Sequence, residues 1–252
     1  MPKLRFATGL AVVGLAGGAL AYPNGTPFYV TDLVPACAAC HSVLDPATMP
    51  ELPAERAAAE VAAQKHLSAV RAGAFPIYSE LDEGQREALA AEIEGYDREA
   101  RVELQLEPTV RAGRTVQARV SYRGGNGPVV GVLLVDRPLR YQARPAQALG
   151  WRILEARART ADGQSADRWF ARRVEPRSAD LNFVTVPAPR PPGAPAPSGT
   201  VTFTLRAPPE PGVYPLTAVL LYGTENTDRN AFLQRPSGRI LFSAPVTVRV
   251  SE

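Results

Sequence analysis

The hydrophobic pattern of this 252-residue chain changes its period near residue 100, and this change restricts the fold more than any other feature. Residues 52–101 are rich in Ala, Glu, Arg and Leu with the spacing of helices. From Arg101 onward, apolar residues recur at every second position, as they do in Val116–Tyr122. The pattern therefore predicts a helical segment followed by a β segment.

Two helices are expected in the first segment. Pro53 can open one of them, from about Ala54 to Ala72, and Gly73 followed by Pro76 would end it.

The second expected helix starts at Asp82, the N-cap, with Gln85 completing a capping box, and runs to about Ala100. One buried stripe is predicted along it: Leu89, Ile93, Tyr96 and Ala100.

The second segment contains short strand-like runs separated by clusters of Gly, Pro and Asn. These runs are Val102–Leu106, Val116–Tyr122, Val129–Val135, Trp151–Ala156, Val201–Leu205, Leu216–Tyr222, Ile240–Phe242 and Val246–Val250. So many short strands predict an antiparallel β-sandwich. The proline-rich run Pro187–Ser198 lies between two of them, so we expect a long loop inside the sandwich rather than a linker.

Charge divides the chain at the same place. Tyr22–Ala100 contains 13 acidic and 5 basic residues, whereas Arg101–Glu252 contains 12 acidic and 21 basic residues. This asymmetry predicts two domains, 22–100 and 101–252. The basic residues are almost all arginines, with Lys3 and Lys65 the only lysines, so no lysine-rich arm indicates nucleic-acid binding.

The N-terminus predicts export. Lys3 and Arg5 precede an uncharged stretch, Phe6–Ala21, that ends in the small-x-small pattern of a signal peptidase site. We expect cleavage after Ala21, a periplasmic or secreted protein, and no membrane span in the mature chain. The alternative is that residues 1–21 remain as an uncleaved anchor.

The chemistry of the chain is concentrated in Cys37-Ala-Ala-Cys40-His41, the signature for covalent attachment of c-type haem. Two thiols at this spacing can bond the two vinyl groups, and His41 then places its imidazole on the iron as proximal ligand. This predicts one covalent haem c per chain. A redox dithiol and half of a zinc site, which would need His66, are the alternatives.

Tyr22–Ala100 resembles a small class I cytochrome c domain. The resemblance is carried by this motif and by the helical run Leu81–Ile93, which matches the C-terminal helix of that family. Ala72–Tyr78 resembles the loop in which that family carries a Met-Pro pair, and Phe75-Pro76 holds that place here. The resemblance implies an all-α haem domain in front of the sandwich. It also implies these haem-pocket candidates: Phe75, Pro76, Tyr78 and Tyr96.

The distal iron ligand has three candidates. His66, which lies on an apolar helical face, is the one we hypothesise, and a second histidine would lower the reduction potential. Met49 is an alternative, although it follows His41 by only eight residues. The third is an open or water-ligated iron. A plain helical histidine with a hydrogen-bond partner is the alternative role of His66.

The β segment has no His, Cys or Met, so it predicts no metal site. Val201–Tyr214 resembles the late strands of Ig-like domains, in which Tyr214 would be the corner tyrosine. Trp151 and Trp169 are expected in the core. Arg172-Arg173 indicates either a solvated face or a patch that docks an acidic surface.

These features predict an exported one-electron carrier, not an enzyme, in which the sandwich is a docking or subunit-interaction module. Its redox partner is expected to be basic where it docks, because an acidic set faces it: Glu80, Asp82, Glu83 and Glu87. The alternatives are a haem-based sensor of gases or other ligands with an open distal site, and an adhesion module with an accessory haem.

Overall fold

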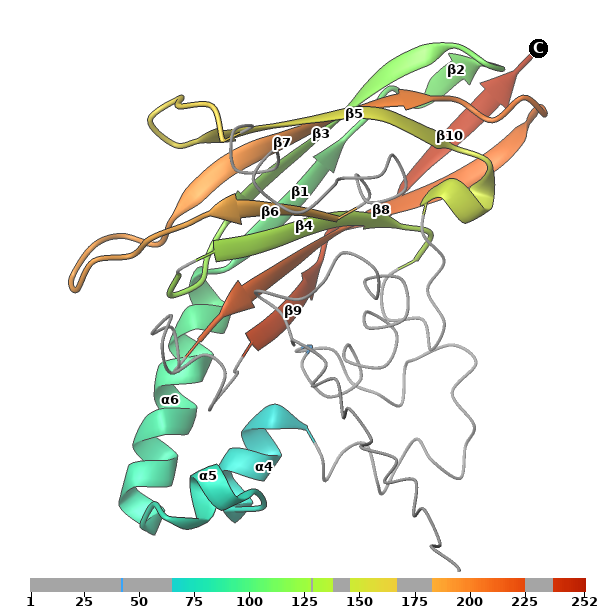
Figure 1. Ribbon diagram of the computed structural model, residues 1–252. Helices are drawn as coiled ribbons and strands as arrows, with labels where there is room; N and C mark the ends of the chain where they lie inside the picture. The colour runs from blue at the N-terminus through green and yellow to red at the C-terminus, as the bar shows by residue number, and fades with distance from the viewer. Residues whose placement is uncertain (1–41, 43–64, 128, 138–145, 167–182, 225–237) are drawn as a thin grey trace, which may run out of the picture.

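The computed structural model describes residues 42, 65–127, 129–137, 146–166, 183–224 and 238–252, and within them a β-sandwich carries a helical extension at one end (Figure 1). The described helices are α4 (His66–Ala72), α5 (Pro76–Ser79) and α6 (Glu83–Glu99). A 3₁₀ helix, η3 (Ala146–Leu149), precedes the strand β5. None of the described helices has both the length and the apolar character to cross a membrane.

The strands form two sheets. The four-stranded sheet has the order β1 (Arg101–Gln105), β3 (Thr115–Arg123), β7 (Ser198–Arg206) and β5 (Arg152–Thr160), with every pair antiparallel. The six-stranded sheet has the order β2 (Thr109–Arg111), β10 (Val246–Ser251), β8 (Gly212–Gly223), β4 (Val129–Val135) and β6 (Phe183–Pro187). Its sixth strand, β9 (Gly238–Phe242), pairs with the end of β8.

This strand order is that of an Ig-like sandwich. If β1, β3, β7 and β5 are read as strands A, B, E and D, then β4, β8 and β10 occupy the places of C, F and G. The short β2 runs parallel to β10 as the second half of strand A. β6 departs from the pattern because it joins the edge beside β4 only after β5. The predicted sandwich is confirmed.

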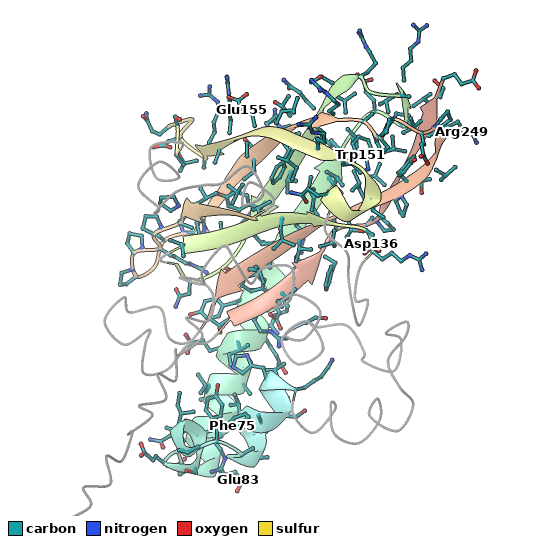
Figure 2. All side chains as sticks on the ribbon, turned by 45° about the vertical axis from the view of Figure 1, so that its right-hand side comes forward. Phe75, Glu83, Asp136, Trp151, Glu155 and Arg249 are labelled. Atoms are coloured by element: carbon teal, nitrogen blue, oxygen red, sulfur yellow. The ribbon has the colours of Figure 1, made fainter. Side chains whose placement is uncertain are left out.

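The core lies between the inner faces of the two sheets, and it includes Trp151, Phe203 and Tyr222, each at most 1% exposed. Figure 2 shows Trp151 between the sheets and Glu155 on the outer side of β5. The core position of Trp151 is as predicted, whereas Trp169 and Arg172-Arg173 lie outside the described residues. The corner tyrosine is also confirmed, because the hydroxyl of Tyr214 donates to the Glu210 carbonyl at 2.8 Å.

Most predicted strands are present, and β4 has the predicted bounds. The Pro187–Ser198 run connects β6 to β7 as a loop inside the sandwich, as expected. Two strands were missed, β2 and β6. β2 has only three residues, and β6 ends in a proline, so neither provides enough alternation to be recognised.

Helix α6 begins as predicted. The Asp82 carboxylate accepts from the Gln85 backbone N–H at 2.8 Å, and the Gln85 side chain accepts from the Asp82 N–H at 2.9 Å. Gly73 ends α4 in the left-handed conformation, with φ of 62°. The single helix predicted across 54–72 is wrong, however, because Lys65 has an extended ψ of 138° and α4 starts after it; residues 54–64 lie outside the described residues.

The predicted fold class, a small all-α haem domain followed by a sandwich, is wrong. The described residues are mostly β, and two of their three helices have only seven and four residues. The buried stripe predicted on α6 shows why the helices do not form a separate domain. Ile93 packs with α4 and α5, whereas Tyr96 and Ala100 pack against the sandwich core. The helix is thus part of the sandwich at one end, and β1 starts immediately after it.

Candidate functional site

The described residue nearest in sequence to the haem-attachment motif is Ser42, which follows His41 directly. Cys37, Cys40 and His41 themselves, and Met49, lie outside the described residues. Ser42 is only 1% exposed and forms a parallel β-bridge with Ile240 of β9. The chain that leaves the motif is therefore fixed to the six-stranded sheet.

Ile240 belongs to an apolar surface on the side of this sheet that faces away from the sandwich core. Alternate residues of β4 and β8 fill the core, so the residues between them point to the opposite side. Leu133 of β4 pairs with Val219 of β8, and Leu221 of β8 pairs with Ile240 of β9. We call this surface the outer apolar face, and its members are 7% exposed or less: Leu133, Val135, Val219, Leu221 and Ile240.

One polar group is buried on the outer apolar face. Thr217 pairs with Val135 across the β4–β8 register, and its hydroxyl oxygen has no hydrogen-bond partner among the described residues. An apolar wall with a buried hydroxyl fits a haem, whose ring is apolar and whose propionates accept hydrogen bonds. Ser42 is bridged to Ile240, which pairs with Leu221. Thr217 lies four residues from Leu221 along β8 on the same side of the sheet, so this surface has the chemistry that the predicted haem would need.

A buried ionic cluster ties α6 to the same sheet. Arg239 of β9 donates to both carboxylate oxygens of Asp97, with Nη2 to Oδ2 at 2.6 Å and Nε to Oδ1 at 3.0 Å. The Tyr222 hydroxyl donates to Oδ1 of the same carboxylate at 2.7 Å. The Arg239 and Asp97 side chains are 3% and 11% exposed. Sequence reasoning missed this cluster because no local motif connects its members.

Burial raises the pKa of Tyr222 well above its ordinary value, and the negative charge of Asp97 raises it further. The phenol therefore stays protonated and keeps donating to the carboxylate. Since Arg239 immediately precedes Ile240, the ionic cluster and the Ser42 bridge occupy neighbouring positions on β9.

His66 and Tyr78, both predicted at the haem, are brought together by the helices. His66 is the first residue of α4 and is 5% exposed, and its Nε2 lies 3.0 Å from the Tyr78 hydroxyl oxygen. Tyr78 comes from α5 and packs with Val70 and Ile93 in the small helical cluster. A bond from Nε2 of His66 to iron would therefore have to replace the hydrogen bond to Tyr78.

The other pocket candidates lie in different places. Phe75 is 48% exposed and meets the Tyr78 ring edge-on at 6.3 Å, and Pro76 is exposed at the start of α5. Tyr96 lies at the sandwich end of α6, where the Arg190 guanidinium sits 5.6 Å from the centre of its ring. Tyr96 is thus part of the junction between helix and sandwich.

Among the residues that the structure describes, no three His, Cys, Asp or Glu side chains gather closely enough to hold a metal ion. The described neighbours of His66 therefore do not complete a zinc site.

Comparison with known proteins yields fold-level likenesses only. No protein-family model and no curated protein matches the chain. The C-terminal domain of the Streptococcus agalactiae AgI/II polypeptide BspA aligns with 60% of this chain and 50% of its own, at 9% identity and a TM-score of 0.37. The CARDB domain of a Pyrococcus furiosus protein, in complex with di-metal ions, aligns with 60% of this chain and 87% of its own, at 12% identity and a TM-score of 0.26. The chain thus spans about half the length of the BspA domain that it matches.

Proposed function

We propose that this protein is an exported c-type cytochrome that transfers single electrons through a covalently attached haem. The observation that carries the proposal is Cys37-Ala-Ala-Cys40-His41, in which both cysteines of the chain and an adjacent histidine have the spacing of the attachment signature. The two thiols would hold the haem and His41 would bind its iron. Bound haem supplies an iron that alternates between the ferric and ferrous states.

The outer apolar face is the support that we propose for this haem. Ser42, the residue after His41, is bridged to Ile240 of β9, so the polypeptide would lead from the haem to the edge of that surface. Leu133, Val219 and Leu221 would exclude water from one side of the group. The Thr217 hydroxyl, which has no partner among the described residues, would donate a hydrogen bond to a polar substituent of the haem. The all-α cytochrome globule is not part of this proposal.

Docking to a redox partner would use the helical extension. Glu80, Asp82 and Glu83 are exposed around the start of α6, and this negative surface suits a partner that is basic where it docks. Glu87 is exposed too, but Arg71 binds it at 3.2 Å and thereby neutralises part of the acidic set. The sandwich would provide docking or subunit contacts, in a periplasmic or secreted setting.

One observation favours a second function, a haem-based sensor of gases or other ligands. The Nε2 of His66 is already engaged by Tyr78, and an iron that recruited neither His66 nor Met49 would be open to an added ligand. An electron carrier would be six-coordinate and closed, whereas a sensor would bind carbon monoxide in the ferrous state.

The attachment is tested by producing the full chain with a haem-attachment system and measuring its mass after denaturation. One covalent haem is expected, and the Cys37→Ser/Cys40→Ser variant should carry none. A chain without covalent haem would end the cytochrome proposal. The support is tested with Leu221→Ala, which should shift the haem absorption bands, against Val248→Ala, an equally apolar truncation in the sandwich core that should leave them unchanged.

Absorption spectra under carbon monoxide separate the two functions. A low-spin spectrum that carbon monoxide does not move supports the electron carrier, and a high-spin or shifted spectrum supports the sensor. Conversion to high spin in His66→Ala, but not in Met49→Ala, would identify His66 as the distal ligand. Tyr78→Phe removes the competing hydrogen bond, so it should strengthen any coordination by His66.

A further inference from the structure

The outer surface of the four-stranded sheet is strongly basic. Residues that alternate with the core residues of β1, β3, β7 and β5 point to solvent, and among them are seven arginines and two glutamates. We call this surface the basic face. Its charged members are Arg101, Glu103, Arg119, Arg123, Arg152, Glu155, Arg157, Arg159 and Arg206.

Strand register arranges these charges in rows across the sheet. Thr202 of the central strand β7 has Arg119 on one side and Arg157 on the other. Two rows further along, Arg206 lies between Thr115 and Arg152, and the row between them holds Gln117, Thr204 and Glu155. Directly opposed side chains are about 5 Å apart at Cβ, so the rows hold several cations within one Debye length. Such close spacing of like charges costs stability unless an anion binds there.

Little negative charge within the described structure offsets these arginines. Arg157 forms an ion pair with Glu155 at 2.9 Å, and both side chains are largely exposed, at 65% and 47%. Arg101 and Arg159 donate to backbone carbonyl groups, which leaves their charge uncompensated. Arg119, Arg123, Arg152 and Arg206 form no ion pair with any described residue. The face thus retains a large positive charge.

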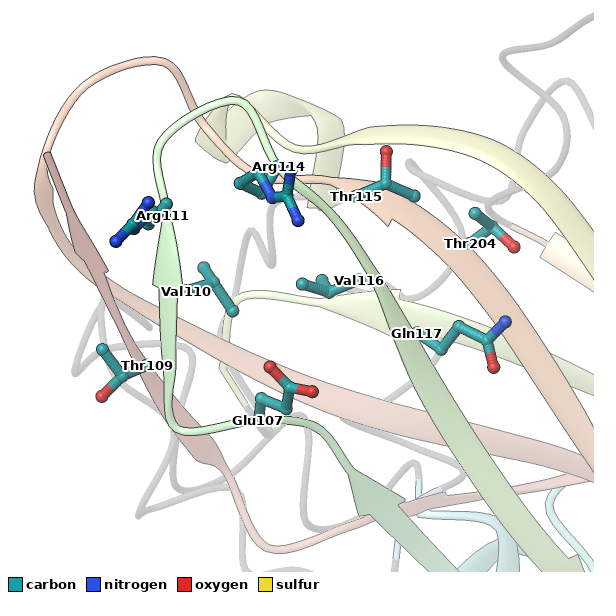
Figure 3. A pocket seen from close by; sticks show the side chains of 9 residues that line it. All are labelled: Glu107, Thr109, Val110, Arg111, Arg114, Thr115, Val116, Gln117 and Thr204. Carbon is teal, nitrogen blue, oxygen red and sulfur yellow. The ribbon is translucent and has the colours of Figure 1, made fainter.

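An open pocket of about 640 Å³ extends the basic face at the end of the sandwich (Figure 3). Thr115, Gln117 and Thr204 of the basic face line one side of it, and Arg111 and Arg114 bring two more cations to its rim. Glu107 is the one acidic residue in its lining. The pocket gives a concave region to a surface that is otherwise the flat side of a sheet.

We propose that the basic face docks the carboxylate-rich surface of a partner protein, a proposal that rests on the docking role proposed above. Four strands of five to nine residues give a surface of about 500 Å², and the pocket brings it towards the roughly 800 Å² that each partner buries in a standard protein interface. The planar fork of arginine matches a carboxylate through two hydrogen bonds, whereas threonines between the arginines fix register with polar contacts.

A protein partner suits this face better than a lipid surface does. Binding to a bilayer interface normally adds aromatic or aliphatic side chains that insert between the headgroups. Among the described residues of the basic face, Leu154 is the one large apolar side chain that is exposed, at 39%, and it lies at the β-bulge in β5. The docked acidic protein would be separate from the basic partner of α6, because the two surfaces have opposite charge.

The test measures binding of poly-L-glutamate, a carboxylate-rich polypeptide, to the haem-loaded full chain at 50 mM and 200 mM salt. Arg119→Glu/Arg157→Glu reverses the central row and should weaken binding by about tenfold at the lower salt and flatten the salt dependence. Arg98→Glu/Arg137→Glu makes the same charge change at exposed sites on α6 and after β4, and should change affinity less than about twofold. Unchanged thermal unfolding and haem spectra show that both variants are folded and loaded.

Three results would overturn the proposal. Equal weakening by the two double variants would mean that only net charge matters. Tighter, Arg119-dependent binding of dextran sulfate, or of phosphatidylglycerol vesicles, would assign the face to a polysaccharide or a membrane. Self-association in sedimentation that Arg119→Glu/Arg157→Glu abolishes would assign it to a second copy of the chain. None of these readings depends on electron transfer, so a failed docking proposal and a failed cytochrome proposal remain distinguishable.

Discussion

The two sheets of the sandwich share one core but differ on their outer surfaces. The outer surface of the four-stranded sheet is exposed, polar and basic, with Thr202 between Arg119 and Arg157. Along β4 and the last eight residues of β8, the outer surface of the six-stranded sheet is apolar and buried, with Leu133 beside Val219. The four-stranded sheet thus faces water, whereas the six-stranded sheet is buried on both sides along β4 and the last eight residues of β8.

The sequence of each strand records this difference. In β3, buried and exposed residues largely alternate, which is typical of an antiparallel strand with one solvent-exposed face. In β4, all seven residues, VVGVLLV, are buried, and the last eight residues of β8 are buried as well. A continuous apolar run therefore identifies a stretch of strand that is covered on both faces. It is the six-stranded sheet that holds Ser42, the residue that follows Cys37-Ala-Ala-Cys40-His41.

The largest expected effect is at the buried ionic cluster of the six-stranded sheet. Asp97→Ala leaves the Arg239 cation without its carboxylate in a buried place, and should lower the free energy of unfolding by about 3–5 kcal/mol. Urea denaturation measures this difference.

The exposed ion pair of the four-stranded sheet is the control for that experiment. Glu155→Ala removes the partner of Arg157, and should cost less than about 1 kcal/mol because both side chains are solvated. The double variant Asp97→Ala/Arg239→Met should be more stable than Asp97→Ala, since it also removes the Arg239 charge that Asp97→Ala leaves buried without a partner. Similar losses for Asp97→Ala and Glu155→Ala would show that the two sheets do not differ in this respect.

A pair of truncations compares the outer surfaces directly. Leu133→Ala removes a fully buried side chain from the outer apolar face, and should cost about 2–5 kcal/mol. Thr202→Ala on the basic face should change the free energy of unfolding by about 0.5 kcal/mol or less. Thermal and urea unfolding of both variants measure the contrast. A cost for Leu133→Ala as small as that for Thr202→Ala would mean that the outer apolar face is not packed.

Alkaline pH should destabilise the protein through one tyrosine from each sheet. Burial raises the pKa of Tyr122 in β3, and burial together with Asp97 raises that of Tyr222 in β8. Below pH about 10 both phenols are protonated in the folded and unfolded states, so the stabilisation is complete there. Above it the unfolded chain releases protons that the folded chain retains, so the free energy of unfolding falls by about 1.4 kcal/mol per pH unit for each tyrosine.

Urea midpoints between pH 8 and pH 11 measure this slope. Tyr122→Phe should reduce it by one tyrosine's share, and a slope that survives in Tyr122→Phe/Tyr222→Phe would contradict the assignment. Tyr222→Phe should also lose stability at pH 8, because it removes the hydrogen bond to Asp97. The comparison thereby separates a plainly buried phenol from one that holds an ionic cluster.

Features set by neighbouring residues were predictable from the sequence. The capping box fixed the start of α6, and the apolar run fixed β4. The motif Cys37-Ala-Ala-Cys40-His41 is likewise local, but its haem chemistry stays a prediction because these residues lie outside the described ones. The bridge from Ser42 to Ile240 was not predictable, because it joins opposite ends of the described chain and leaves no local pattern.

The prediction of a separate all-α domain failed for a related reason. The helical stripe on α6 was identified correctly, but periodicity does not say what covers a stripe. Ile93 packs against the other helices. Ala100 packs so closely on Gly124 of the sandwich that a Cβ added to Gly124 would lie 2.9 Å from the Cα and Cβ of Ala100. In the same way, Asp97 and Arg239 are 142 residues apart, and only the assembled fold shows that they form a pair.

A modest effect is expected at the corner of the six-stranded sheet, where Tyr214 lies in the more exposed end of β8. Tyr214→Phe keeps the edge-on contact with Trp151, at 6.3 Å between ring centres, but removes the hydrogen bond to the Glu210 carbonyl. The expected cost is about 1 kcal/mol, the usual net value of one hydrogen bond. Tyr214→Leu removes the ring contact as well and should cost more, so urea unfolding of the two variants separates the hydrogen bond from the packing. A neutral Tyr214→Phe would show that the Trp151 contact, and not the hydrogen bond to Glu210, holds this corner.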